Sequence, residues 1–102
     1  MTWKEDIDRV KRGERFEDPE ILAKGSLGKE GESYVEENGT LVYPGASIAH
    51  VQASLGWTTL DPDILSLKDI YGRTVLDRMI RRGWKPKTEE EKLVIFTVKA
   101  GA

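Results

Sequence analysis

The chain has 102 residues, of which 33% are charged, and a formal net charge of −2. This length allows one small domain, and the near-neutral charge argues against a partner held by the overall charge of the molecule. The absence of cysteine excludes a disulfide framework and thiolate chemistry. No apolar run is long enough to span a membrane and the first residues lack a signal-peptide pattern, so we expect a soluble, cytoplasmic protein with no membrane partner.

Residues 2–12 are predicted to form the first helix. Thr2 and Glu5 have the spacing of a capping box at its start, and Gly13 would end it. A few positions after that glycine, Asp18-Pro19 has the pattern of an N-cap followed by proline at the first helical position. We therefore expect a helix and a second, shorter one before the first interruption of the pattern.

Residues 23–43 are predicted to be an insertion with a β-hairpin in its second half. The stretch from Asp18 to Gly45 is more than twice as long as the equivalent stretch from Asp61 to Gly72. Within 33–43, Asn-Gly separates two runs of strand-forming residues, which is typical of a two-residue hairpin turn.

One pattern then occurs twice, at 45–57 and at 72–84. Each copy opens with Gly, has Ser or Thr two positions later and closes with Gly-Trp. Self-similarity at a fixed period, here about 27 residues, is typical of a repeat protein. Each copy predicts a short helix, near 46–55 and near 73–82, which would have to stack to bury its apolar stripe. The expected core residues are Ile7, Ile48, Ala49, Ala53, Leu76, Met79, Ile80, Trp57 and Trp84.

These residues resemble a known family. Residues 47–56, Ser-Ile-Ala-His-Val-Gln-Ala-Ser-Leu-Gly, resemble the Thr-Pro-Leu-His-x-Ala-Ala-x-x-Gly signature of ankyrin repeats. Residues 72–76 resemble the Gly-x-Thr-Pro-Leu that opens such a repeat, and the tail at 93–102 is similar to its second helix and final Gly-Ala. The sequence departs from the family where Ile48 and Val75 replace proline, and its period is shorter than the usual one of about 33 residues.

The resemblance implies one ankyrin-like domain, mainly α. It would consist of a degenerate unit at 2–44 that carries the inserted hairpin, a repeat at 45–71 and a repeat at 72–102. The missing length falls in the second helix of the middle repeat. That helix is expected to be reduced to a turn between Trp57 and Leu67.

Residues 93–98 admit two interpretations. Four β-branched residues in six favour a strand, which would dock on the 33–43 hairpin and make the domain α+β. The capping-box spacing of Thr88 and Glu91 and the ankyrin resemblance favour a helix. We prefer the strand.

The sequence offers little catalytic chemistry. His50 is the only imidazole, and the resemblance implies that it is structural, hydrogen-bonding the preceding turn. We find no metal-ligand spacing and no phosphate loop, and we expect no cofactor and no enzymatic activity.

Two binding functions are left. The first is protein–protein interaction by the exposed tips at 25–40 and 67–72, and the alternative is binding of nucleic acid or another polyanion by a basic face that contains no acid between 78 and 87. Self-association through an open end of the stack would also be possible. The expected partner-binding residues are Arg78, Arg81, Arg82, Lys85, Lys87, Asp69 and Tyr71.

Overall fold

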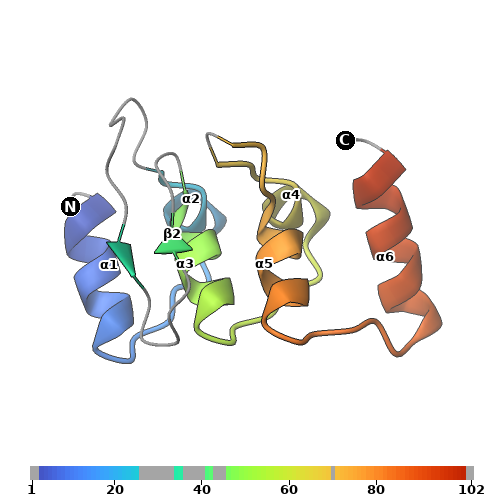
Figure 1. Ribbon diagram of the computed structural model, residues 1–102, viewed down its shortest axis with the longest axis horizontal. Coiled ribbons are helices and arrows are strands. Elements are labelled where there is room, and N and C mark those ends of the chain that lie inside the picture. The colour runs from blue at the N-terminus through green and yellow to red at the C-terminus, as the bar shows by residue number, and fades with distance from the viewer. Residues whose placement is uncertain (1–2, 26–33, 36–40, 43–45, 70, 101–102) are drawn as a thin grey trace.

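The computed structural model of the chain describes residues 3–25, 34–35, 41–42, 46–69 and 71–100. The protein is mainly helical (Figure 1). Its helices are α1 (Trp3–Lys11), α2 (Pro19–Leu22), α3 (Ile48–Ser54), α4 (Pro62–Leu65), α5 (Val75–Arg81) and α6 (Glu89–Ala100). Among the described residues, no helix is long and apolar enough to cross a membrane.

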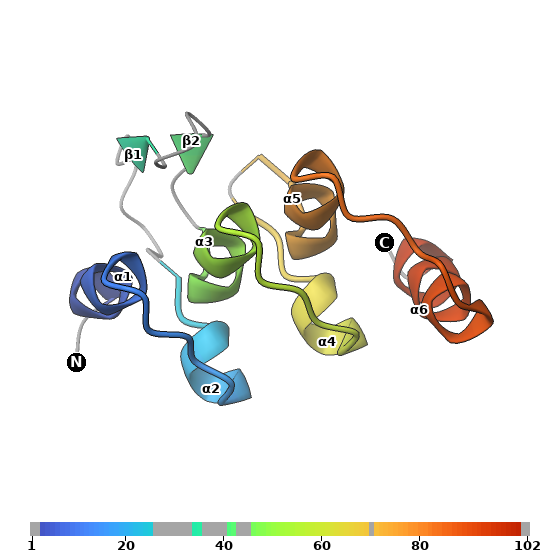
Figure 2. The same cartoon turned by 90° about the horizontal axis from the view of Figure 1, so that it is seen from below.

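The helices form two parallel rows (Figure 2). One row contains α1, α3 and α5, with α3 packed against both neighbours. The other row contains α2, α4 and α6, and α6 packs against α4. The core lies between the rows and is formed by Ile7, Val10, Leu22, Ala46, Ile48, Ala49, Val51, Ala53, Ile64, Leu65, Val75, Leu76, Met79 and Val98.

The predicted helix boundaries follow from local chemistry. Ser47 and Thr74 are N-caps in extended conformation, and each accepts a hydrogen bond from the amide at the third position of its helix. Asp18 and Asp61 cap the short helices α2 and α4 before a proline in a similar way. The helices of the first row each end at a glycine with φ near +100°, a conformation that costs other residues energy: Gly13, Gly56 and Gly83.

Equivalent connections join the second row back to the first. The main-chain carbonyl of Lys24 accepts a hydrogen bond from the Ile48 amide at 2.8 Å. The main-chain carbonyl of Leu67 likewise accepts one from the Val75 amide at 3.2 Å. Isolated antiparallel bridges, Gly25 with Ser47 and Lys68 with Thr74, close the base of each connection. The backbone therefore repeats although the first connection is much longer than the second.

The expected hairpin is described only in part. β1 (Tyr34–Val35) and β2 (Leu41–Val42) pair antiparallel, with Tyr34 opposite Val42. The Asn-Gly turn between them, residues 26–33 and 43 of the insertion, and the Thr2 cap lie outside the described residues, so the hairpin as a whole stays a prediction.

The strand preferred for residues 93–98 is wrong, because they belong to helix α6. Thr88 and Glu91 form the capping box that starts this helix: the Thr88 amide donates to Glu91 Oε1 at 3.2 Å and the Glu91 amide donates to Thr88 Oγ1 at 3.1 Å. Val94, Ile95 and Val98 recur at helical spacing and pack on the core. The cap and this apolar face outweigh the β propensity of the run.

The predicted face of α5 is also partly wrong. Ile80 is 44% exposed, whereas Arg78, which we expected to point outward, is only 4% exposed. Arg78 shares a side of α5 with Arg82, whose Nε lies 3.9 Å from the place that a Cβ of Gly56, just after α3, would occupy. The buried side of α5 thus faces α3 and includes Arg78, with Nε and Nη2 of its guanidinium.

Candidate interaction surface

His50 joins two successive repeats. Its Nδ1 accepts a hydrogen bond from the Ser47 amide at 3.0 Å, and its Nε2 lies 2.9 Å from the carbonyl oxygen of Arg73. Because Nδ1 accepts from a main-chain amide, the proton of a neutral ring must lie on Nε2, which donates to that carbonyl. The side chain is fully buried. Burial lowers the pKa of His50, and the hydrogen bond to Arg73 opposes this shift in part.

The turn after α4 ends in an exposed tyrosine. Asp69 Oδ1 accepts hydrogen bonds from the amides of Tyr71 and Arg73, both at 2.9 Å, and ties these two residues to Asp69. Asp69 itself is 6% exposed and its Oδ1 is used inside the turn, so it offers little surface to the partner that we predicted for it. Tyr71 is 65% exposed, and the Arg73 guanidinium lies 5.9 Å from its ring centroid. The turn presents one large aromatic side chain on a fixed backbone.

The basic residues predicted as a binding face are not all on one surface. Arg78 is buried and does not present its guanidinium on that face. The others are exposed, and no ion pair in the described part of the chain involves them: Arg81, Arg82, Lys85 and Lys87. They lie at the C-terminal end of α5 and in the segment after it, on the edge of the stack opposite the connection between α4 and α5 (Figure 1).

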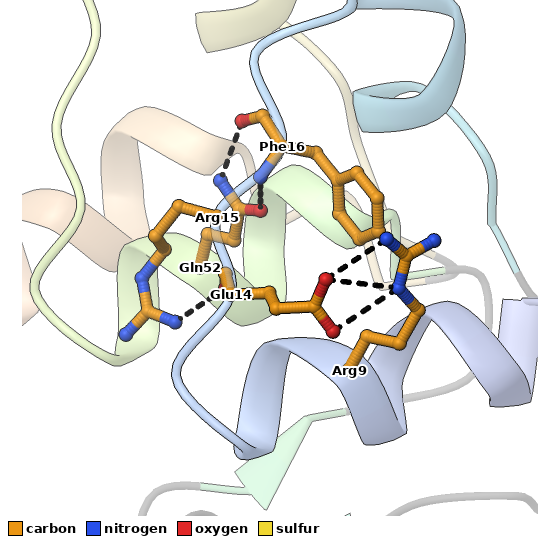
Figure 3. A network of polar contacts seen from close by, with 5 residues as sticks. All are labelled: Arg9, Glu14, Arg15, Phe16 and Gln52. Atoms are coloured by element: carbon orange, nitrogen blue, oxygen red, sulfur yellow. Dashed lines mark hydrogen bonds and ion pairs between the residues drawn. The ribbon is translucent and has the colours of Figure 1, made fainter.

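A polar network lies at the junction between the first two units (Figure 3). Gln52 of α3 accepts a hydrogen bond from the Phe16 amide at 2.7 Å and donates one to the Phe16 carbonyl at 3.1 Å. Arg15 donates to a main-chain carbonyl of α1 at 3.0 Å. Arg9 pairs with Glu14 at 2.8 Å, which lowers the pKa of Glu14. The segment after α1 is thereby fastened to both helices.

The junction between the second and third units is open. It contains a groove of about 310 Å³ between the segment after α3 and the end of α5. The groove is lined by Ala53, Gly56, Trp57, Thr58, Met79, Arg82 and Trp84. Both tryptophans are partly buried against the core.

We predicted that the two tryptophans belong to the core, but nothing in their pattern indicated that they also line a groove. Aligning the repeats residue by residue would have provided that indication. At the second junction Met79 stands in the place of Gln52, and Thr58 in the place of Arg15.

The described residues hold no group of three or more His, Cys, Asp or Glu side chains placed to bind a metal ion. Protein-family models, curated proteins and solved structures were compared with the chain, and none matches.

Proposed function

We propose that this chain is a non-catalytic protein-interaction module built from degenerate ankyrin-like repeats. Three features support the repeat assignment: the two rows of helices, the equivalent connections that return to Ile48 and Val75, and the buried His50 at the signature position. Repeat stacks of this kind bind through surface that successive units present along one edge. Cytoplasmic residence remains a prediction from the sequence.

The Tyr71 turn is the observation that carries the proposal. An exposed tyrosine whose backbone is already ordered loses little conformational entropy on binding, and tyrosine is enriched among the residues that dominate protein interfaces. Asp69 provides this order through its two hydrogen bonds.

Recovery of proteins from native lysate on the immobilised domain tests the proposal. Tyr71→Ala should weaken capture of the retained partner by about tenfold or more, as for an interface hot spot. Lys99→Ala, an exposed change on α6, is the matched control and should leave capture unchanged. Deletion of residues 28–31 tests the other predicted tip. Capture that is equal in the wild type and in both tip variants would contradict the proposed binding edge.

A second candidate function is polyanion binding by Arg81, Arg82, Lys85 and Lys87, because these cations are exposed without ion pairs in the described structure. Neutralising Arg81 and Lys85 should then weaken binding to single-stranded DNA at low salt. The slope of log affinity against log salt should decrease by about 0.7 for each lost phosphate contact. Unchanged salt dependence would exclude this function for the basic cluster.

A further inference from the structure

Corresponding positions can be compared directly at the two junctions of the stack. Gly13, Gly56 and Gly83 end the first-row helices and set the alignment. The residue after each glycine donates its amide to the carbonyl five positions earlier, at 2.9–3.1 Å. The local backbone is therefore the same, and differences between the junctions arise from side chains.

Two residue differences distinguish the second junction, which holds the groove, from the first. Met79 stands where Gln52 stands in the first junction, and a thioether cannot donate and accept as the Gln52 amide does with the Phe16 backbone. Thr58 stands where Arg15 stands, and its short side chain cannot hold the segment after the helix to the end of that helix, as Arg15 does at the Val10 carbonyl. The second junction, which lacks both contacts, is the one that holds the groove.

The lining of the groove indicates what it can hold. Its walls are mainly apolar: the rings of Trp57 and Trp84, the side chain of Met79 and the methyl of Ala53. Its volume of about 310 Å³ is at the lower end of the range for binding pockets, about 300–1,000 Å³, and therefore suits a few side-chain groups rather than a large cofactor.

The rim of the groove carries positive charge. Arg82 is part of the lining and is exposed, with no ion pair in the described structure. Arg81 and Lys85 lie close to it in the chain and are exposed as well. The lining includes no Asp or Glu. A carboxylate on the occupant would be the complementary group, and Arg can bind it through two parallel hydrogen bonds.

We propose that this groove binds a peptide segment of a partner protein in which an apolar side chain lies next to an aspartate or glutamate. The apolar side chain enters between Trp57 and Trp84, and the carboxylate pairs with Arg82. The inference rests on the proposed function in that the occupant is a protein. It adds a second surface, on the edge opposite Tyr71.

A displayed library of short random peptides, selected on the immobilised wild-type protein, tests the inference. Selected peptides are synthesised and their affinities are measured by fluorescence anisotropy. The selected sequences should share an apolar residue next to an acidic one. Arg82→Glu should weaken their binding by about fivefold or more, as expected for loss of an exposed ion pair with some added repulsion. Lys99→Glu makes the same change of charge on α6 and should have no effect.

The double variant Thr58→Arg, Met79→Gln copies the first junction and should close the groove. It should abolish peptide binding while the far-ultraviolet circular dichroism spectrum stays that of the wild type. Gln52 is fully buried at the equivalent position, so the fold accommodates an amide there. If this variant does not fold, Arg82→Glu still tests the inference, because Arg82 is exposed and its replacement should leave the protein folded.

The inference would be overturned by selected peptides without an acidic residue, by binding that Arg82→Glu leaves unchanged, or by an oligothymidylate that occupies the groove more tightly than any peptide. Binding that is lost in Tyr71→Ala but retained in the groove variants would refute the groove and leave the proposed function in place. If the wild type enriches no peptide and captures no protein, both fail.

Discussion

Single hydrogen-bonding side chains hold neighbouring units together in this stack. His50 is bonded at both ring nitrogens, to Ser47 in its own unit and to Arg73 in the next one. Gln52 fastens the second unit to the first through Phe16. Both side chains are fully buried, so a replacement that breaks their bonds leaves main-chain groups unpaired as well.

The free energy of unfolding should depend on His50 and on pH. His50→Gln is expected to lower it by about 1–3 kcal/mol at neutral pH, the cost of leaving buried polar groups unsatisfied. The pKa of His50 is below its usual 6.5 in the folded protein. The unfolded chain then binds a proton more readily, and the stability that neutral His50 provides is present above about pH 6.5 and is lost as the pH falls toward the folded pKa.

Urea unfolding of the wild type and of His50→Gln from mildly alkaline to mildly acidic pH measures both effects. The difference in stability should shrink as the pH falls, because only the wild type has the histidine. The pKa values of Glu14 and Glu91 are lowered from their ordinary 4.5, so these two groups do not titrate in the pH range of this experiment. A difference that is constant with pH would show that His50 is not held neutral.

At the scale of elements, most helix limits could be predicted because they are set by neighbouring residues in the chain. Asp18 acts as the cap that we expected, and Ser47, Thr74 and Asp61 cap their helices with side-chain oxygens as well. The error at 93–98 has a physical reason. The β-branched residues of α6 gain more from packing Val94, Ile95 and Val98 on the core than their propensity costs.

The apolar stripe of α5 can be tested with two leucines. Leu76→Ala should lower the free energy of unfolding by about 2–5 kcal/mol, because Leu76 is only 2% exposed and its loss creates a cavity. Leu93→Ala on α6 is the matched control, since Leu93 is 65% exposed and should change stability by less than about 0.5 kcal/mol. Chemical denaturation measures both. Equal effects at the two sites would contradict the assignment of Leu76 to the core.

At the scale of the whole molecule, the sequence predicted units that stack, but not how well each junction is closed. The repeated Gly-Trp pattern identified Trp57 and Trp84 as equivalent. The groove lies beside Met79 and Thr58, which cannot make the hydrogen bonds that Gln52 and Arg15 make at the first junction. A repeated pattern of similar residues does not show that such a hydrogen bond is absent. Arg78 was misplaced for a related reason: the rotation of α5 is set by its contact with α3, which the stripe of one helix does not determine.

Because an isolated β-bridge closes the base of each connection, the stack should accept a longer loop in place of a short one. Gly25 and Ser47 close a path several times longer than the one that Lys68 and Thr74 close. The extra entropy of closing the longer loop is only about 1 kcal/mol, since it grows with the logarithm of length. A polar segment that equalises the two loops, inserted between Lys68 and Thr74, should therefore lower the free energy of unfolding by about 1 kcal/mol and keep α5 folded. Loss of cooperative thermal unfolding in the graft would show instead that the short turn, with Asp69, is required for the third unit to dock.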